Sequence, residues 1–559
     1  MHNNIIIYLS NFLKDYLSKS SLEEIYNSIS LTPSIEKGHF CFKPFIVAKQ
    51  YKAKPQELIE DICQKLTTNE NIIAISVSKN YLNFKLSTKF LASNTLNSKK
   101  ESLCQNPKNI MIEYSQPNTH KQLHIGHMRN LCLGNTLINI QKRVGHNVTS
   151  ATYPGDIGTH VAKALYYIKH VYKEALPTTN KGEWLGNMYV LATEYAQNNN
   201  IEDNITTILK AIKNKDEPYY SLWKETRQWS IDLMKETYKW SGVEFDEWFF
   251  ESTVDKSSVE YITSLYQDNL LVKNDGAIGL DLSEDNLGFC VLLKKDGNGL
   301  YSTKDIELAR KKFQEYNIDE SIYLVDNRQS LHFKQIFKAL EKIGFEQSKN
   351  CKHVAYEMVE LPEGAMESRK GNIIPIAILI NNMEEHIEST YLNDKDWSEQ
   401  EKSIIKKQIA NAAIKYGMVC LDNTKKITFK MKEWLKLEGE TGPYLQYSAV
   451  RINSILNKVK SNATVDYSLL SSKQEVILLM ELNKFNDVLI QCSKNYKSVA
   501  LCKYLYSLAK SFNSFYAECS INNAANEQLK ASRLELAKKT LDILSDGLSL
   551  LGIEVPNKM

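Results

Sequence analysis

A buried strand that leads through a short turn into a helix is the feature that most limits how this chain can fold. Residues 110–114 form an apolar, strand-like run, and residues 115–118 contain the proline and asparagine that are typical of a turn. After His124-Ile125-Gly126-His127, apolar residues recur with helical spacing. In an open α/β sheet, ligands bind beyond the carboxyl ends of the strands. The pattern therefore places two histidines at the edge of a sheet where a ligand would bind.

The chemistry of this stretch suits a phosphate group. The first turn of a helix offers unpaired N–H groups and the positive end of the helix dipole. Gly126 lets a flat ring or a phosphate approach the backbone closely. His124 and His127 can donate hydrogen bonds to phosphate oxygens as charge builds on them. The alternative is a pair of structural imidazoles, because a four-residue motif is by itself a weak signal.

The same alternation of strand, loop and helix repeats along the middle of the chain. Strand-like runs at 147–153 and 322–325 are each followed by a loop and a helix, which begin near residues 160 and 332. A third run, 353–359, is followed by a basic loop at 363–372. This alternation predicts a doubly wound parallel sheet of the Rossmann type. Residues from about 170 to 295 are mostly helical and charged, and they end in hairpin-like runs at 277–281 and 289–293, so we expect an insertion there.

The two ends of the chain have different patterns. Residues 1–105 contain helical and strand-like runs of an α+β unit, and Asn106-Pro107 is a plausible linker. From about 376 the pattern is helical, and the last helix carries one apolar stripe that Gly552 terminates. We therefore expect an N-terminal domain (1–105), a catalytic α/β domain (106–375), a connecting helical region (376–440) and an all-α helical bundle (441–559).

Composition narrows the function classes. The net charge is +3, which excludes a nucleic-acid binder that works by bulk charge but leaves room for a local basic face. Lysines between residues 402 and 436, interleaved with Phe429 and Trp434, form either a solvated helix face or an RNA contact surface. The ten cysteines show no C-x-x-C spacing, which favours reduced thiols in a cytoplasmic protein over a zinc site. The sequence has no apolar run of transmembrane length, and its N-terminus lacks the features of a signal peptide.

Several further segments, in order along the chain, resemble the arginyl-tRNA synthetases, which are class I aminoacyl-tRNA synthetases. They are 113–118 (EYSQPN) with Lys121, 124–127 (HIGH), 300–305 (LYSTKD), 328–332 (RQSLH) and 441–447 (TGPYLQY) through Arg451. The tail 547–559 resembles the end of that family's anticodon-binding domain. The N-terminal unit resembles the family's additional domain, which contacts the tRNA elbow.

The resemblance implies a two-step reaction. The carboxylate of arginine attacks the α-phosphate of ATP to give arginyl-adenylate and pyrophosphate. The 2′-hydroxyl of the terminal adenosine of tRNA(Arg) then takes the arginyl group and releases AMP. In this family, arginine activation generally requires bound tRNA. The resemblance also implies Mg²⁺ that accompanies ATP and is held by its phosphates rather than by a protein metal site. We expect a monomer.

The resemblance also assigns roles to residues. The catalytic set is His124, His127, Lys121, Arg369 and Lys370. The ATP set is His124, Gly126, His127, Met358, Val359 and Lys370. The arginine set is Glu113, Ser115, Asn118, His124, Tyr301, Asp305, Gln329 and Glu251. The tRNA set is Tyr444, Gln446, Tyr447 and Arg451.

These roles have a physical basis and some alternatives. A guanidinium is a planar cation with a fork of donors, so its recognition requires carboxylates such as Asp305. For Glu251 the alternative is a surface glutamate. For Glu113 and Gln329 it is a polar residue that only ties loops together. For Tyr444 and Tyr447 it is a place in the core of the bundle.

Three departures from the family pattern are visible. The loop that usually reads Lys-Met-Ser-Lys-Ser is Ala365-Met366-Glu367-Ser368-Arg369, and many arginyl-tRNA synthetases have a similarly degenerate loop. The Asp-Trp-Gly motif appears as Asp156-Ile157-Gly158, and 448–451 lacks a histidine that other members carry. The last two departures spare the charged groups, so we expect retained activity with altered local packing, whereas the loop lacks both usual lysines and leaves Arg369, Lys370 and Lys121 as the available cations. Two other hypotheses are kept: a class I synthetase for another amino acid, and a catalytically inactive, synthetase-like RNA-binding protein.

Overall fold

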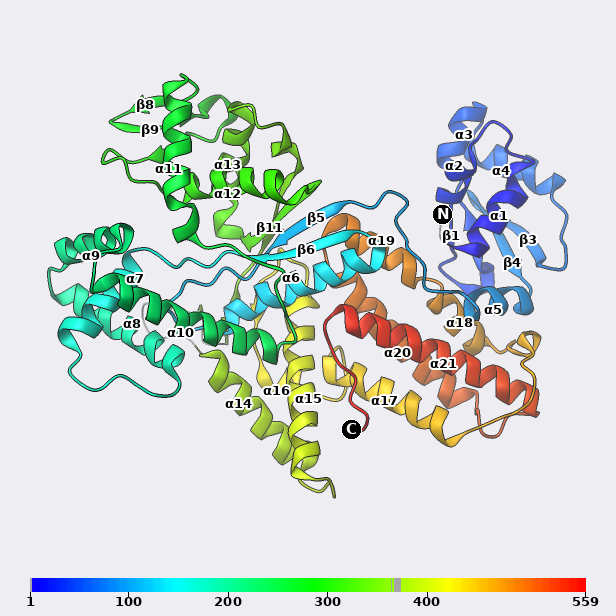
Figure 1. Ribbon diagram of the computed structural model, residues 1–559. Helices are drawn as coiled ribbons and strands as arrows, with labels where there is room; N and C mark the ends of the chain where they lie inside the picture. Colours follow the sequence, from blue (N-terminus) through cyan, green and yellow to red (C-terminus); the bar gives the residue numbers. More distant parts are fainter. Residues whose placement is uncertain (1–2, 363, 366–373) are drawn as a thin grey trace.

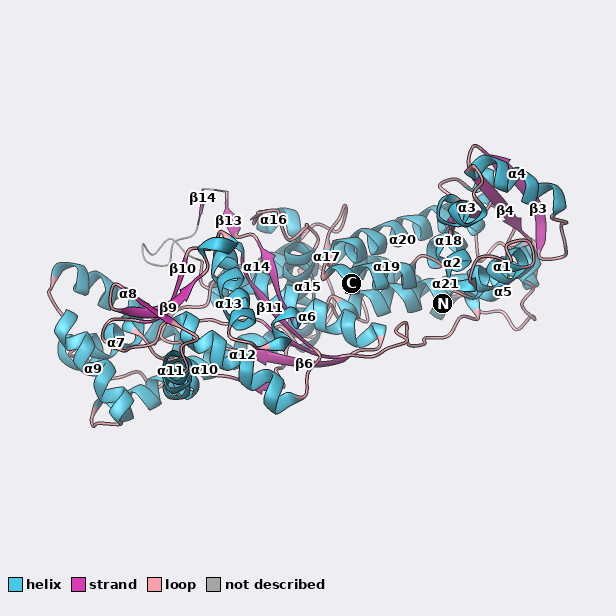
Figure 2. Ribbon diagram, turned by 90° about the horizontal axis from the view of Figure 1, so that it is seen from above, coloured by secondary structure: helices cyan, strands magenta, loops and turns pink. Residues whose placement is uncertain are grey.

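The computed structural model describes residues 3–362, 364–365 and 374–559 as an elongated molecule. The N-terminal unit, blue in Figure 1, lies at one end beside the C-terminal helices, and the helices of the insertion form the other end (Figures 1 and 2). A parallel sheet lies between them. Within the described residues, no helix has the length and apolar character needed to cross a membrane.

The central sheet confirms the predicted doubly wound architecture. Its strand order is β12-β11-β5-β6-β7, and all neighbouring strands are parallel. The strands are β5 (Asn109–Glu113), β6 (Asn147–Thr152), β7 (Glu247–Trp248), β11 (Glu320–Asp326) and β12 (Cys351–Tyr356). From β5 the chain moves to β6 on one side, and it later returns to β11 on the other. The sheet therefore has its topological switch point between β5 and β11, where such folds bind ligands.

Four helices that follow or precede these strands carry residues of the candidate site. They are α6 (Ile125–Val144), α11 (Glu251–Gln267), α12 (Tyr301–Tyr316) and α13 (Ser330–Lys342). Gly134 of α6 packs directly on Tyr114, since a Cβ at Gly134 would lie 2.1 Å from the Tyr114 ring. Close packing of this kind fixes the height of α6 over β5.

Two features of the sheet differ from the sequence-based expectation. Strand β7 lies inside the expected insertion, and its two residues join the central sheet and so divide the insertion. A strand of two residues is too short to produce an alternation of apolar and polar residues that could be recognised in the sequence. The expected strand at 353–359 is also divided. Its first part is β12, and Val359–Leu361 forms β13 in a separate sheet. The buried guanidinium of Arg129 binds the carbonyls of Glu357 and Met358 at the break.

The remaining elements of the insertion are helical except for one small sheet. That sheet has the antiparallel order β10-β9-β8, and the expected hairpin at 277–281 and 289–293 is confirmed as β9 (Ala277–Asp281) and β10 (Phe289–Leu293). The other elements of the region are α7 (Thr159–Tyr166), α8 (Lys181–Asn198), α9 (Glu202–Asn214), α10 (Tyr219–Trp240) and β8 (Val272–Asn274).

The N-terminal unit is α+β, as expected. Its antiparallel sheet has the order β1-β2-β4-β3, and Phe40, Phe42 and Phe84 are fully buried in its core. The strands are β1 (Ile29–Leu31), β2 (Phe40–Phe42), β3 (Ile72–Ser78) and β4 (Tyr81–Leu86). The helices are α1 (Asn4–Lys14), α2 (Leu22–Asn27), α3 (Phe45–Tyr51), α4 (Pro55–Lys65) and α5 (Thr88–Leu96).

The C-terminal part is helical, as expected, apart from β15 (Ile427–Thr428), which pairs with β13. Gly552 follows the last helix with φ +70°, the left-handed conformation of a helix terminator. The helices are α14 (Ile376–Ile387), α15 (Glu399–Val419), α16 (Met431–Trp434), α17 (Gly442–Lys458), α18 (Lys473–Leu482), α19 (Phe485–Asn495), α20 (Val499–Glu518) and α21 (Glu527–Leu550).

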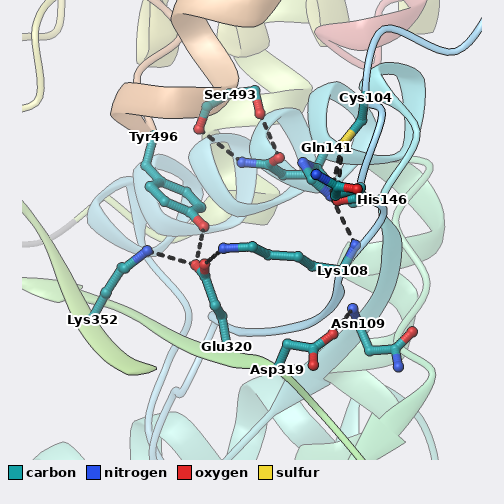
Figure 3. Close-up of polar contacts among 11 residues, drawn as sticks. Cys104, Lys108, Asn109, Gln141, His146, Asp319, Glu320, Lys352, Ser493 and Tyr496 are labelled. Atoms are coloured by element: carbon teal, nitrogen blue, oxygen red, sulfur yellow. Dashed lines mark hydrogen bonds and ion pairs between the residues drawn. The ribbon is translucent and has the colours of Figure 1, made fainter. Parts of the chain in front are cut away.

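A polar cluster joins the amino-terminal edge of the central sheet to α19 (Figure 3). Glu320, at the start of β11, is 7% exposed and pairs with Lys108, with Lys352 (2.6 Å) and with the hydroxyl of Tyr496 (2.9 Å). Burial alone would raise the pKa of Glu320, but these hydrogen bonds outweigh it and lower the pKa to about 2. The ionised carboxylate therefore holds the sheet and the helical part together.

The junction predicts an acid-dependent loss of stability. A carboxylate with a lowered pKa stabilises the fold above its unfolded pKa of 4.5, and this contribution is lost as the pH falls towards 2. We expect Glu320→Gln to lower the free energy of unfolding by about 2 kcal/mol at pH 7, and by progressively less between pH 4.5 and pH 2. Urea titrations at a series of pH values measure the effect, with the exposed Glu315→Gln as a control. An equal loss at every pH would contradict the assignment.

Candidate active site

The first turn of α6 is closed by the two histidines of the HIGH segment. His124 is the N-cap residue, and its Nδ1 accepts a hydrogen bond from the Gly126 N–H at 3.1 Å. The Nδ1 of His127 accepts from the His124 N–H, also at 3.1 Å. The two rings lie with their centroids 4.0 Å apart. This is the reciprocal geometry of a capping box, built from imidazoles in place of the usual hydroxyl and carboxylate.

The cap fixes the protonation of both rings. Because each Nδ1 accepts a backbone hydrogen bond, the proton of each neutral imidazole resides on Nε2. Burial, with a smaller effect of the Lys121 ammonium, lowers the pKa of His124 to about 4. Burial, His124 and Lys121 place the pKa of His127 well below its ordinary value. Both rings are therefore neutral Nε2–H donors at pH 7, suited to an anion whose charge increases during a reaction.

A cavity of about 540 Å³ opens at the carboxyl ends of β5, β6 and β11. Every residue predicted to bind arginine lines it, and so does every described residue predicted to bind ATP. Lys121 is not among the lining residues; its ammonium lies over the Tyr189 ring, 5.2 Å from the centroid. Arg369 and Lys370 lie outside the described residues. The sheet thus brings together segments separated by more than 200 residues.

Two carboxylates face the cavity from adjacent helices. Glu251, the first residue of α11, is 6% exposed, and its Oε2 lies 2.8 Å from the Lys304 ammonium. The alternative of a surface glutamate is therefore wrong. Burial raises the pKa of Glu251 to about 7 against the opposing effect of Lys304. Asp305, on α12, lies 2.6 Å from His332 Nε2, and Tyr301 at the start of α12 is 60% exposed.

Glu113 and Ser115 line the cavity but are already held by the protein. Glu113, 3% exposed, forms an ion pair with the fully buried Lys312. The Ser115 hydroxyl is 2.9 Å from the hydroxyl of Tyr238. These contacts favour the alternative that Glu113 ties structural elements together, at least through one of its oxygens.

Gly155 permits a close approach between the loop after β6 and its neighbours. A Cβ at this position would lie 2.3 Å from Asn118 Oδ1 and 2.9 Å from Glu251 Oε1. The next residue, Asp156, is fully buried and accepts hydrogen bonds from Arg227 and Ser252. The Pro-Gly-Asp turn therefore sets the position of two cavity residues without contributing a side chain of its own.

Several residues of the cavity were not predicted. Arg328 and His332 belong to the segment 328–332 that carried part of the family resemblance, so a signal for them existed. Among the others, five gave no signal, because only the fold brings them to the cavity: Asn130, Tyr153, Asp326, Phe333 and Tyr356. At the predicted adenine side, the Met358 carbonyl already accepts from Ile427 N–H at 3.1 Å and from Arg129 at 3.3 Å. This leaves the carbonyl of Met358 poorly placed to bind adenine.

The residues predicted to face tRNA do not share one environment. Gln446 is fully buried, and its Nε2 donates to the carbonyls of Gln408 (3.1 Å) and Glu554 (2.6 Å), which argues against a direct contact of its side chain with tRNA. Tyr444 is half-buried, and its hydroxyl accepts from Asn513 at 3.0 Å. Tyr447 is 40% exposed, and the exposed Arg451 lies over the ring of Tyr516. Only Tyr447 and Arg451 of this set have open surface.

Three lysines in the basic stretch of the connecting region are held by other parts of the protein. Lys406 pairs with Glu388, and Lys426 pairs with Glu360. Lys415 is 3% exposed and binds the carbonyl of Gly552. These contacts favour a structural role for those three lysines over an RNA contact surface. Among the described residues, no group of three or more His, Cys, Asp or Glu side chains is placed to hold a metal ion.

Comparison with known proteins connects this geometry to a family. Residues 88–431 match the model of the class I (R) tRNA synthetase catalytic domain, 4–86 match the arginyl tRNA synthetase N-terminal domain, and 445–559 match the DALR anticodon-binding domain. The chain is 44% identical to the arginine–tRNA ligase of Bdellovibrio bacteriovorus over 100% of both chains. It is 34% identical to that of Clostridium beijerinckii over 96% of this chain and 97% of the relative.

Solved structures show the same fold. Thermus thermophilus arginyl-tRNA synthetase superposes with a TM-score of 0.83 at 24% identity, covering 95% of this chain and 96% of that one. The Plasmodium falciparum enzyme superposes with a TM-score of 0.78 at 21% identity, covering 99% and 98%. Because three family models together match most of the chain, and curated relatives match it end to end, the chain belongs to the arginyl-tRNA synthetase family of class I aminoacyl-tRNA synthetases.

Proposed function

We propose that this enzyme, an arginine–tRNA ligase by family, forms arginyl-adenylate in the cavity between β5 and β11 and transfers the arginyl group there to tRNA(Arg). The observation that carries the proposal is the shared cavity. It combines two neutral imidazole donors at a helix N-terminus with two carboxylates fixed on neighbouring helices. The first set suits the phosphates of ATP, and the second suits a guanidinium.

The phosphate end is assigned to the first turn of α6. When a carboxylate oxygen of arginine attacks the α-phosphorus, the bond from that phosphorus to the pyrophosphate oxygen breaks, and negative charge moves onto pyrophosphate. The Nε2–H groups of His124 and His127 would donate to these oxygens, and the helix dipole would add to their effect. Mg²⁺ would arrive with ATP and be held largely by its phosphates. Lys121, Arg369 and Lys370 are the cations proposed to neutralise the leaving pyrophosphate.

The arginine end is assigned to Glu251 and Asp305. Each carboxylate has one oxygen paired with a neighbouring side chain, Lys304 or His332, and a second oxygen that can accept from a guanidinium N–H. Tyr301, exposed at the entrance, would cover the side chain. Asn118 and Gln329 are proposed to bind the α-amino and carboxylate groups. Two acidic partners suit arginine better than an uncharged amino acid, which argues against a synthetase of another specificity.

The tRNA would contact the N-terminal unit and the C-terminal helices. We assign the elbow contact to the N-terminal unit, and a contact of the anticodon stem to Tyr447 and Arg451 on α17. In the second step, the 2′-hydroxyl of the terminal adenosine attacks the arginyl carbonyl carbon, and AMP leaves. We expect the enzyme to act as a monomer in the cytoplasm.

The experiment that tests the proposal is charging of tRNA(Arg) with labelled arginine, run beside ATP–pyrophosphate exchange with and without tRNA. We expect charging, and exchange that depends on added tRNA. Binding of tRNA without charging or exchange would return the protein to the inactive, RNA-binding hypothesis. Exchange supported by a different amino acid would contradict the placement of the guanidinium.

Loss of either α6 imidazole should slow the chemical step more than it weakens binding. We expect His124→Ala and His127→Ala each to lower kcat for exchange by about 100-fold to 1,000-fold, with a much smaller change in the KM for ATP. His146→Ala, beyond the other end of α6, is the matched control and should leave kcat unchanged. A rise in KM at unchanged kcat would show that the rings only bind ATP.

The raised pKa of Glu251 predicts a pH-dependent KM for arginine. The guanidinium requires the ionised carboxylate, which is depleted as the pH falls below about 7. We expect the KM for arginine to rise below pH 7 by up to about tenfold per pH unit, while the KM for ATP stays constant. In Glu251→Gln the KM should be high and nearly independent of pH. A wild-type KM that is flat between pH 6 and pH 8 would contradict the assignment.

The two environments on α17 predict opposite behaviour. Arg451→Ala should raise the KM for tRNA about threefold to fivefold and make it less sensitive to salt, because one exposed cation is lost. Gln446→Leu should leave that KM unchanged but lower the free energy of unfolding by about 1–3 kcal/mol, because the Gln408 and Glu554 carbonyls lose a buried donor. Filter binding at several salt concentrations and urea unfolding separate the two effects.

A further inference from the structure

The hydrogen bond between His332 and Asp305 has no role in the reaction described above. His332 Nε2 lies 2.6 Å from Asp305 Oδ2, which is short for a contact between nitrogen and oxygen and typical of a charged acceptor. The two side chains are 23% and 19% exposed, and both line the candidate cavity. Within the described part of the chain, His332 is the hydrogen-bond partner of the Asp305 carboxylate.

The contact joins two elements that the sheet holds at a fixed separation. Asp305 is the fifth residue of α12, and His332 is the third residue of α13, just past the carboxyl end of β11. The imidazole packs edge-on against the ring of Phe333, at 5.4 Å between centroids. Phe333 in turn stacks on His353 of β12, at 4.7 Å. His332 is therefore supported from the sheet, whereas Asp305 stands on a helix at the side of the cavity.

The chemistry of the pair assigns the direction of the hydrogen bond. An ionised carboxylate has no hydrogen, so Nε2 of His332 must be the donor. The Oδ2 atom of Asp305 then accepts a hydrogen bond from His332, and this bond restricts rotation of the carboxylate plane. A guanidinium is recognised through two parallel N–H···O bonds, which need the carboxylate plane in one orientation. A carboxylate that turned freely would lose conformational entropy whenever arginine bound.

We propose that His332 is a positioning residue for arginine recognition, because its Nε2–H holds the Asp305 carboxylate in the orientation that reads the guanidinium. His332 does not itself contact the substrate. The inference rests on the proposed placement of the arginine side chain at Asp305.

The test compares steady-state charging by variants at His332, with tRNA present throughout. We expect His332→Ala to raise the KM for arginine about tenfold, the size associated with losing a hydrogen bond to a charged group. The kcat at saturating arginine and the KM for ATP should change by less than twofold. His332→Gln, which places an N–H donor near the Nε2 position, should restore the KM to within about threefold of the wild-type value.

Two controls separate positioning from general damage to the fold. Lys334→Ala changes an exposed residue of the same helix that does not line the cavity, and it should leave the KM for arginine unchanged. In the Asp305→Asn background, which itself raises the KM for arginine, adding His332→Ala should cause little further change, because the two residues act as a unit.

The outcomes are distinct. An unchanged KM in His332→Ala, an equal rise in the KM for ATP, a failure of His332→Gln to restore function, or full additivity with Asp305→Asn would each overturn the inference. If wild-type enzyme charges arginine but Asp305→Asn has no effect, the placement of the guanidinium fails and the inference fails with it. Absence of charging by the wild-type enzyme would instead refute the proposed function as a whole.

Discussion

The hydrogen bonds in the first turn of α6 are the interaction on which the rest of the site depends. They convert two histidines into neutral donors of known direction, and they do so with backbone groups that every helix leaves unpaired. The same helix then runs 20 residues away from the cavity. Near its far end, Gln141 of α6 forms two buried hydrogen bonds with Ser493 of α19 (Figure 3). The cap therefore lies at the N-terminus of α6, and the C-terminal part of the same helix is held by the helical part of the molecule.

The cavity also shows how several carboxylates can be placed close together in a partly buried site. An isolated buried carboxylate would take up a proton, because burial disfavours its charged form. Here three carboxylates of the cavity each have an internal donor that compensates part of their charge. The pairs are Glu113 with Lys312, Glu251 with Lys304, and Asp305 with His332. The compensation is incomplete for Glu251, whose pKa stays near 7, so this carboxylate gains most from an added guanidinium.

Sequence patterns predicted the elements whose signal is local and failed where the signal is distant. The α6 helix, the hairpin of β9 and β10 and the parallel sheet all follow from periodicity and turns within about twenty residues. The two-residue strand β7 and the break between β12 and β13 do not, since one is too short and the other depends on a guanidinium over 200 residues away. Family resemblance supplied the roles of site residues, but it could not tell that Gln446 points into the bundle. Burial of that kind is a property of the packed helices.

The two edges of the central sheet have different roles. The carboxyl edge carries the cavity, and the amino edge carries Glu320, which Tyr496 attaches to the helical part (Figure 3). A tRNA that contacts the helices can influence the cavity only through contacts that differ between bound and free states. The Glu320 cluster and the Gln141–Ser493 pair are buried contacts on such a route, and both reach elements that end or begin at the cavity. Any influence of bound tRNA that passes through these two contacts would therefore act along β11 and α6, because each of these elements also reaches the cavity.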